Sequence, residues 1–376
     1  MAGIYIHIPF CRKACYYCNF HFSTSLQRVD EMMQAIEKEL LMRQNYLSET
    51  IDTIYFGGGT PSLVDSNAIK QLLTQIKNTY NVSSSVEITL EANPEDIDAR
   101  KADDLITLGI NRISLGIQSF EDDILQSLNR SHNSIQAINA IQQLHNSGFS
   151  NITLDLIYGI PAQSTEMWNN NLAQAIDFGI QHLSCYALTI EEKTAFGHWQ
   201  RQGVFTPVAE NHYENDYKSM CRILREAGYN HYEVSNFALP GFESRHNSAY
   251  WQHQAYMGLG PGAHSYNYTG RTFTISNNAS YIKSIKKGEQ PNQTETLTTS
   301  QRFNEYLLTG LRTNQGIDLT SIKKEFGVNL LKQKKYFIDQ CLNDNRAILK
   351  NNRFIITENA LILADSIILE LMMDEL

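Results

Sequence analysis

The stretch IYIHIPFCRKACYYC (residues 4–18) places three cysteines within eight residues, directly after an apolar run. Residues 4–8 have the pattern of a buried strand, so the cysteines are predicted to lie on the loop that follows it. Their spacing is C-x3-C-x2-C, and each of three such thiolates can bind one iron of a 4Fe–4S cluster. Three ligands for four irons leave one iron open to an exchangeable ligand. The pattern therefore predicts a reaction site, with Cys11, Cys15 and Cys18 as its metal ligands.

Zinc is the main alternative for these three cysteines. A zinc site usually combines two short Cys or His pairs, and His7 and His21, which flank the loop, can complete such a site. The chain begins without a secretory segment, so a cytoplasmic protein without disulfides is expected. The other cysteines stand alone in the sequence and are predicted to be core thiols: Cys185, Cys221 and Cys341.

Composition limits the class of protein and its partners. The 376 residues are enough for one large domain and a smaller one, and the 42% hydrophobic content can fill a substantial core. The net charge of −9 argues against a nucleic-acid partner, because phosphate binding needs clustered Lys and Arg. No apolar run approaches the length of a membrane helix, so no integral membrane segment is predicted.

Short apolar strands alternate with helical patterns through the first half of the chain, which is typical of parallel β/α architecture. Strands are predicted at residues 4–8, 53–56, 86–90, 112–115, 153–158 and 183–188. Helices are predicted at residues 29–46, 67–78, 99–108, 135–147 and 165–178. Six strand–helix units predict an α/β fold with a partial, open (β/α)6 barrel rather than a closed eight-fold barrel.

Polar and glycine-rich segments follow one predicted strand after another. They are the cysteine loop, GGGTP (57–61), EANP (91–94) and GIQS (116–119), and Asp155 lies late in the fifth strand. In barrels of this kind the chemistry collects at the carboxyl ends of the strands. These segments are therefore predicted to surround one site.

Three domains are predicted. Residues 1–190 form the barrel, and residues 191–298 extend it. The extension contains a segment rich in glycine, histidine and aromatic residues (228–268) and a polar, linker-like stretch (276–299). Residues 299–376 form a small helical, winged-helix-like domain with a strand pair at 348–349 and 354–356.

The motifs C-x3-C-x2-C, GGGTP, LEANP, GIQSF and LDLIYGIP, in this order, resemble those of the radical S-adenosylmethionine (radical SAM) superfamily. Nearly the whole chain is similar to the branch that contains oxygen-independent coproporphyrinogen III dehydrogenase and the HemW-type haem chaperones. The resemblance implies a radical SAM barrel with a 4Fe–4S cluster and S-adenosylmethionine as cofactors. In this superfamily one electron from the cluster cleaves the sulfonium of S-adenosylmethionine to methionine and a 5′-deoxyadenosyl radical.

The resemblance also implies which residues contact S-adenosylmethionine. Glu91 can accept a hydrogen bond from its ammonium group, Gln118 can bond a ribose hydroxyl, and Arg130 can pair with its carboxylate. Each feature also has a plainer interpretation: the glycines as a tight turn, Arg130 as a solvated cation, and Asp155 as a helix cap or core carboxylate. The positions that match the family's contacts are Tyr5, Tyr17, Gly58, Gly59, Thr60, Glu91, Gln118, Arg130 and Asp155.

Two departures from the dehydrogenase pattern favour the HemW type. Phe20 stands at the position of that enzyme's fourth cysteine, and only ten residues precede Cys11, where the enzyme has a longer extension. The segment HNSAYW (246–251) has the H-N-x-x-Y-W pattern of the HemW type. The imidazole of His246 can bind haem iron, and the aromatic residues can stack on a porphyrin. A histidine held by local hydrogen bonds is the alternative, and His264 in GLGPGAH (258–264) is a rival ligand.

The sequence thus predicts a haem chaperone that binds haem, a 4Fe–4S cluster and S-adenosylmethionine, and transfers haem to acceptor proteins. It also predicts an electron donor for the cluster and assigns no catalytic residue. The alternative is a radical SAM enzyme that acts on a porphyrin or porphyrinogen, such as oxygen-independent coproporphyrinogen III dehydrogenase. A purely structural iron–sulfur protein fits poorly, because Glu91 and Gln118 would then have no ligand to bind.

Overall fold

Six consecutive parallel strands form the centre of the computed structural model, which describes residues 2–268 and 270–375. Met1 and Leu376, the outer ends of the first and last predicted domains, lie outside this range. The strands are β1 (Ala2–Ile8), β2 (Ile51–Gly58), β3 (Val82–Ala92), β4 (Arg112–Gln118), β5 (Ile152–Tyr158) and β6 (His182–Ala187). All six coincide with predicted strands.

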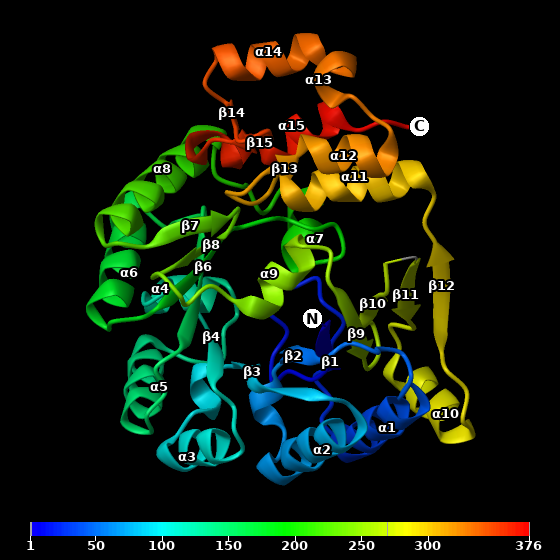
Figure 1. Cartoon of the computed structure of the whole chain (residues 1–376). Helices are drawn as coiled ribbons and strands as arrows, with labels where there is room; N and C mark the ends of the chain where they lie inside the picture. The colour runs from blue at the N-terminus through cyan, green and yellow to red at the C-terminus, as the bar shows by residue number, and fades with distance from the viewer. Residues whose placement is uncertain (1, 269, 376) are drawn as a thin grey trace.

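Helices between these strands cover the outer face of the curved sheet (Figure 1). They are α1 (Val29–Met42), α2 (Ser66–Thr79), α3 (Ala99–Thr107), α5 (Ser134–Asn146) and α6 (Thr165–Asp177). Gly109 and Gly148, just after α3 and α5, have φ values of +87° and +93°, a conformation that suits glycine at the end of a helix. A short helix, α4 (Asp122–Ser127), was not predicted because its two turns are too short for a periodic pattern.

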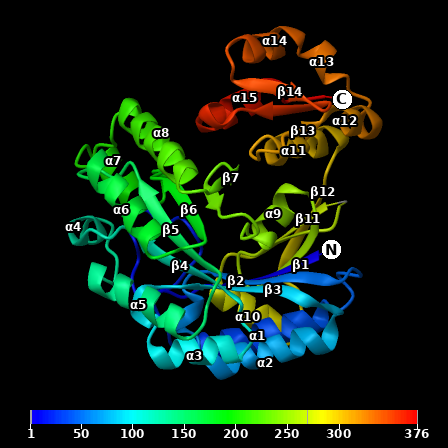
Figure 2. The ribbon, with the colours of Figure 1, turned by 60° about the vertical axis from the view of Figure 1, so that its left-hand side comes forward.

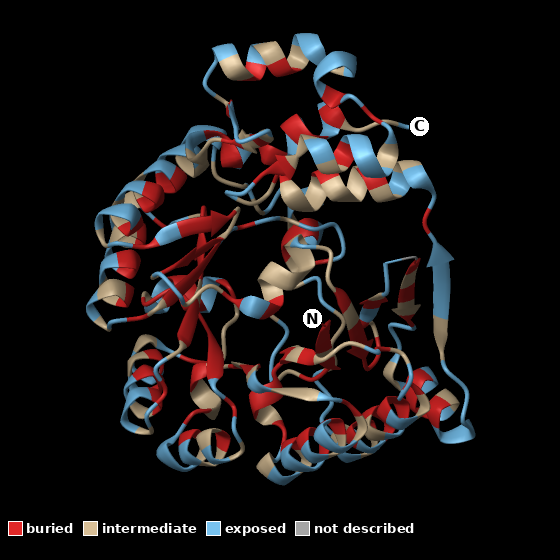
Figure 3. Cartoon of the chain, in the orientation of Figure 1, coloured by how far each residue is buried: buried red, intermediate tan, exposed pale blue. Residues whose placement is uncertain are grey.

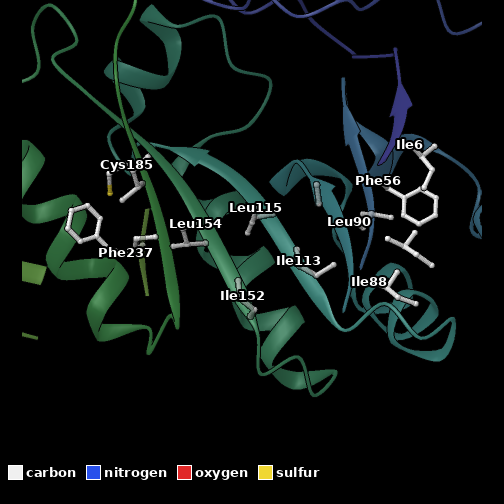
Figure 4. Packing of buried hydrophobic residues seen from close by; sticks show 14 of the residues in the cluster. Ile6, Phe56, Ile88, Leu90, Ile113, Leu115, Ile152, Leu154, Cys185 and Phe237 are labelled. Carbon is white, nitrogen blue, oxygen red and sulfur yellow. The ribbon is translucent and has the colours of Figure 1, made fainter. Parts of the chain in front are cut away.

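Alternation along the strands separates the core from the barrel interior, because successive side chains of a strand point to opposite faces. One set of positions is apolar and packs against the helices, as Figure 4 shows for part of the core, and Figure 3 shows that most of the strand residues are buried. The other set is largely polar and faces inward, where the strand register brings Glu91 beside Ser114 and Asp155 beside Ser184. The core residues labelled in Figure 4 include Ile6, Phe56, Leu90, Ile113 and Leu154.

The sheet continues beyond both edges of the barrel and does not close. Beyond β1 it adds β9 (Ala255–Leu259), which is parallel to β1, and then β10 (His264–Tyr266), β11 (Gly270–Thr274) and β12 (Asn292–Thr296). Beyond β6 it adds β8 (Asn236–Ala238), which is antiparallel to β6, and then β7 (Asn230–Glu233), which is antiparallel to β8. The open barrel predicted from the sequence is confirmed. The remaining helices of this part are α7 (Ala195–Arg201), α8 (Glu210–Glu226) and α9 (Arg245–Trp251).

The stretch predicted to be linker-like has regular structure. It contains α10 (Asn278–Lys287), whose buried residues Tyr281, Ile282 and Ile285 lie on one face, and the edge strand β12. Three apolar residues in a polar segment are a weak helical signal, and the exposed strand carries no apolar alternation. The sequence pattern therefore missed both elements.

The C-terminal part, which lies above the barrel in Figure 2, has its own antiparallel sheet in the order β13-β15-β14. Its strands are β13 (Ile317–Asp318), β14 (Ala347–Lys350) and β15 (Arg353–Ile356), of which the last two form the predicted pair. Helices α11 (Thr299–Gly310), α12 (Leu319–Phe326), α13 (Leu330–Gln333), α14 (Lys335–Asn343) and α15 (Ala364–Leu371) surround it, with a 3-10 helix, η3 (Glu358–Leu363). Across the described residues, the helices are too short or too polar to cross a membrane.

Candidate cofactor site

The three cysteines lie on the loop between β1 and α1, partly exposed and without disulfides. The backbone N–H of Cys11 donates to Ser23 O at 3.1 Å, and Asn129 Nδ2 donates to Ala14 O at 2.8 Å, so the backbone is held at Cys11 and at Ala14. Burial raises the pKa of the Cys11 thiol to about 11 and shifts that of Cys18 in the same direction. In the absence of a metal, the thiols of Cys11 and Cys18 are therefore protonated at neutral pH, and a bound cation must displace their protons.

Arg130 lies against the cysteine loop. Its Nη1 is 3.3 Å from Cys15 Sγ and 3.5 Å from the hydroxyl of Tyr17. Its Nη2 donates to Asn93 Oδ1 and to Gly116 O, both at 2.7 Å. In the described part of the chain, its buried Nε has no hydrogen-bond partner. Arg130 is thus not a solvated cation, and it places a positive charge where a thiolate or a ligand carboxylate is stabilised.

The glycine-rich turn brings β2 against β1 and its loop. Gly58 has a φ of +106°, and a Cβ there would lie 2.5 Å from His7 Nδ1. A Cβ on Gly59 would lie 2.5 Å from Phe10 O, and Thr60 N donates to the same oxygen at 2.7 Å. The packing of the protein itself therefore already requires glycine at both positions. That Gly58, Gly59 and Thr60 contact S-adenosylmethionine stays a prediction.

Two carboxyl groups face the barrel interior. Tyr55 donates to Glu91 Oε1 at 2.9 Å, and the N–H of Gly58 donates to Oε2 at 3.0 Å. Burial and the neighbouring Asp155 raise the pKa of Glu91 to about 7. Burial raises the pKa of Asp155, which accepts from Ser114 Oγ at 3.2 Å, to about 6. Asp155 is not a helix cap, since it lies within β5, and both groups suit a cationic ligand, which would lower their pKa values.

Two further predicted contacts flank these groups. The hydroxyl of Tyr5 is 3.1 Å from His7 Nδ1 at the end of β1. Gln118, the last residue of β4, is buried and has a φ of +67°. A side chain other than glycine rarely adopts this left-handed conformation, so the backbone strain marks the end of β4 as a candidate functional position.

A cavity of about 980 Å³ adjoins the cysteine loop and opens to solvent. This volume lies in the range of pockets that bind small molecules and cofactors. Its wall combines two cysteines with imidazole and aromatic side chains, which include Tyr5, His7, Cys15, Cys18, Phe20, His21, Tyr250, Tyr256 and His264. Phe20, which stands where the dehydrogenase pattern has a fourth cysteine, is 72% exposed.

His246 lies behind this cavity in the barrel interior. Its Nδ1 is 2.7 Å from Thr53 Oγ1, and its Nε2 is 2.8 Å from the hydroxyl of Tyr250, which lines the cavity. The ring stacks on Tyr55 at 5.0 Å, and burial lowers its pKa to about 3. Both nitrogens are thus hydrogen-bonded here, whereas His264 is exposed in the cavity wall. That His246 binds haem iron stays a prediction, and it requires Nε2 to leave Tyr250.

Several residues of the site were not singled out from the sequence. Asn93 holds Arg130, Tyr55 holds Glu91, and Tyr250 caps His246. Asn93 belongs to the EANP motif, but the sequence assigned it no role. Tyr250 was predicted to stack on a porphyrin, and its hydrogen bond to His246 was not foreseen. Tyr55 pairs with Tyr5 across β1 and β2, and strand alternation alone places it on the interior face.

Comparison with known proteins identifies the family. Residues 5–174 match the model of the radical SAM superfamily. Heme chaperone HemW of Lactococcus lactis subsp. lactis is 32% identical over 99% of this chain and 97% of its own length, and that of Bacillus subtilis is 35% identical over 88% of each chain. The chain belongs to the HemW family of radical SAM proteins. In structure it is similar to coproporphyrinogen III oxidase (HemN) from Escherichia coli, with a TM-score of 0.85, 19% identity, and coverage of 98% of this chain and 89% of the other.

As a radical SAM protein, this member of the HemW family has a 4Fe–4S cluster and S-adenosylmethionine as its cofactors. The residues present fit them. Three free thiols share one loop, and the orphaned Nε of Arg130 lies beside it. Glu91 and Asp155 are half-buried, and among the described residues neither forms an ion pair.

Proposed function

We propose that this chain is a haem chaperone, which binds haem together with a 4Fe–4S cluster and S-adenosylmethionine and passes the haem to acceptor proteins. The observation that carries the proposal is the cavity of about 980 Å³ beside the cysteine loop, whose aromatic and imidazole side chains suit a porphyrin and its iron. The relatives named Heme chaperone HemW, which match almost the whole chain, support it.

In this proposal Cys11, Cys15 and Cys18 hold the cluster, and an external electron donor reduces it. The reduced cluster, when bound, supplies the electron that cleaves the sulfonium of S-adenosylmethionine. Arg130 neutralises thiolate and carboxylate charge from its fixed position. Glu91 accepts from the ligand's ammonium group, while Tyr5, Tyr17, Gly58, Gly59, Thr60, Gln118 and Asp155 complete the contacts. Free cysteines throughout the described residues suit a reducing compartment, and we place the protein in the cytoplasm.

An anaerobic titration tests the function. Protein with a reconstituted cluster is titrated with haem, with and without S-adenosylmethionine, while 5′-deoxyadenosine is assayed in the same samples. We expect one saturable haem-binding transition and transfer of the bound haem to an apo-haemoprotein. The proposal would be contradicted if haem binding to this protein did not saturate. It would also be contradicted if the bound haem did not pass to the apo-haemoprotein.

A radical SAM enzyme that acts on a porphyrinogen is the second candidate, because the chain shares its fold with coproporphyrinogen III oxidase. The discriminating feature is turnover of coproporphyrinogen III coupled to formation of 5′-deoxyadenosine. The exposed Phe20 at the position of that enzyme's fourth cysteine favours the chaperone. Rescue of a strain that lacks the dehydrogenase, by this gene alone, would favour the enzyme.

Binding of S-adenosylmethionine is expected to depend on pH through Glu91. The pKa of Glu91 is about 7, so the carboxyl is charged above pH 7 and neutral below it. The charged form attracts the ligand's ammonium group, and affinity should therefore fall by up to about tenfold for each pH unit below 7. Equilibrium binding to the reconstituted protein on either side of pH 7 measures this effect.

Two variants control that experiment. Glu91→Gln should bind weakly and lose the pH dependence near 7. Tyr55→Phe removes a hydrogen bond that lowers the pKa of Glu91, so the midpoint should move to higher pH. An affinity of the wild-type protein that stays flat across pH 7 would exclude Glu91 as the ammonium acceptor.

A further inference from the structure

Far from the cysteine loop in the sequence, three side chains with metal-binding atoms meet where the barrel contacts the C-terminal part. Cys221 comes from α8, His231 from β7 and Glu358 from η3, and one ligand atom of each lies within 4.8 Å of the others. Figure 1 shows α8 running up to the C-terminal helices at the upper left. His231 Nδ1 is 3.6 Å from Glu358 Oε1 and 4.0 Å from Cys221 Sγ. None of the three takes part in the function proposed above.

The surroundings of His231 orient one nitrogen toward the other two residues. Nε2 lies 3.3 Å from the carbonyl oxygen of Val234, which only accepts, so in the neutral ring the proton is on Nε2. Phe237 stacks on the ring with a centroid separation of 4.0 Å and an angle of 13°, which fixes its plane. Nδ1 therefore presents a lone pair to a carboxylate oxygen and a sulfur. A backbone carbonyl that holds the second nitrogen is the usual support of a metal-bound histidine.

Glu358 is held by two hydrogen bonds. Arg225 Nη1 donates to its Oε2 at 2.5 Å, and the hydroxyl of Tyr217 donates to its backbone oxygen at 2.8 Å. Oε1 is the oxygen left facing His231. The guanidinium of Arg225 on Oε2 thus orients the carboxylate and leaves Oε1 directed toward His231.

We propose that Cys221, His231 and Glu358 bind a zinc ion, or another divalent cation of similar softness, as a site separate from the cluster. A thiolate, an imidazole and a carboxylate are ligands that zinc accepts, and water supplies the fourth position. Ligand atoms of a tetrahedral zinc site are about 3.3 to 3.7 Å apart. The two His231 distances, 3.6 and 4.0 Å, need little or no change, whereas Cys221 and Glu358, whose ligand atoms lie within 4.8 Å, must approach by up to about 1 Å. The side chain of Glu358 is 29% exposed, which gives the ion and the water a path from solvent.

Binding involves one covalent change. A bond forms between the cation and Cys221 Sγ, the S–H bond breaks, and the proton passes to solvent, so no oxidant or reductant is needed. Because the ligands come from α8, β7 and η3, the ion would join the barrel to the C-terminal part. The rival arrangement is a protonated His231 paired with Glu358 beside a neutral thiol, with no metal bound.

Cobalt binding to the full chain distinguishes these arrangements. The parent for the test carries Cys11, Cys15 and Cys18 all changed to Ser, so that the cluster loop offers no thiolate. Titrated anaerobically with Co²⁺, it should develop the near-ultraviolet absorption of a cobalt–thiolate bond with one ion per chain, and Zn²⁺ should abolish that absorption. Zinc should also raise its midpoint of thermal unfolding.

Variants test whether the cobalt–thiolate absorption comes from Cys221, His231 and Glu358. Adding Cys221→Ser should remove the thiolate absorption and the zinc-dependent shift in unfolding, whereas Cys341→Ser, at a buried cysteine of α14, should change neither. Glu358→Gln should keep the thiolate absorption and weaken cobalt binding by at least about tenfold. No absorption from the parent at stoichiometric Co²⁺, or absorption that survives Cys221→Ser, overturns the proposal. If Cys221→Ser does not fold, an unchanged affinity in both His231→Gln and Glu358→Gln overturns it equally.

Discussion

Replacing Cys11, Cys15 and Cys18 together by alanine should abolish the iron–sulfur cluster. The visible absorbance of the reconstituted protein should disappear, and bound iron should fall from about four per chain to near zero, because no other thiols meet on one loop among the described residues. Iron and sulfide analysis after anaerobic reconstitution measures the loss. S-adenosylmethionine binding should weaken with it if, as the resemblance to radical SAM proteins implies, the open iron is one of its contacts.

Cys185→Ala is the matched control, because Cys185 is a buried cysteine on β6 outside the loop. It should retain the cluster. The triple variant should keep its fold, since the backbone bonds of Cys11 to Ser23 and of Phe10 to Thr60 do not use the thiols. A triple variant that still held four irons per chain would show that the ligands lie elsewhere.

Changing His246 to alanine should weaken haem binding by about 10- to 100-fold and shift the Soret band, while the cluster remains. The physical reason is that alanine removes the proposed iron ligand, His246 Nε2, which in the structure is hydrogen-bonded to the Tyr250 hydroxyl in the cavity wall. Exchange of that hydrogen bond for a bond to iron costs about 1 kcal/mol, which a metal–imidazole bond exceeds. Haem titration of the variant, followed by absorption, measures both effects.

Two further variants separate ligation from packing. Tyr250→Phe frees Nε2 of His246, so if His246 is the ligand, this variant should bind haem at least as tightly as the wild-type protein. His264→Ala removes the exposed imidazole of the cavity wall. Loss of binding in His264→Ala with an unchanged spectrum in His246→Ala would assign the iron to His264. No change in either variant would show that neither residue is the iron ligand.

Much of the fold could be predicted because its signals are local. The apolar runs of β1 to β6, the helical periods between them and the glycines after α3 and α5 each depend on a few neighbouring residues. The prediction that residues 276–299 are linker-like differs from the structure because the elements there have no strong local signal. The helix α10 depends on three buried side chains that pack against α1, and no neighbouring residues reveal that contact.

The sequence by itself determined the open β/α barrel, the cysteine loop at the end of β1 and the family of the protein. These follow from spacing and alternation along the chain. Only the tertiary structure decided that Arg130 contacts Cys15, that His246 is closed off by Tyr250, and that Cys221, His231 and Glu358 meet. Each of these contacts joins side chains through the pairing of strands and the packing of separate elements. Distances between such residues depend on the summed geometry of everything between them, which no local pattern specifies.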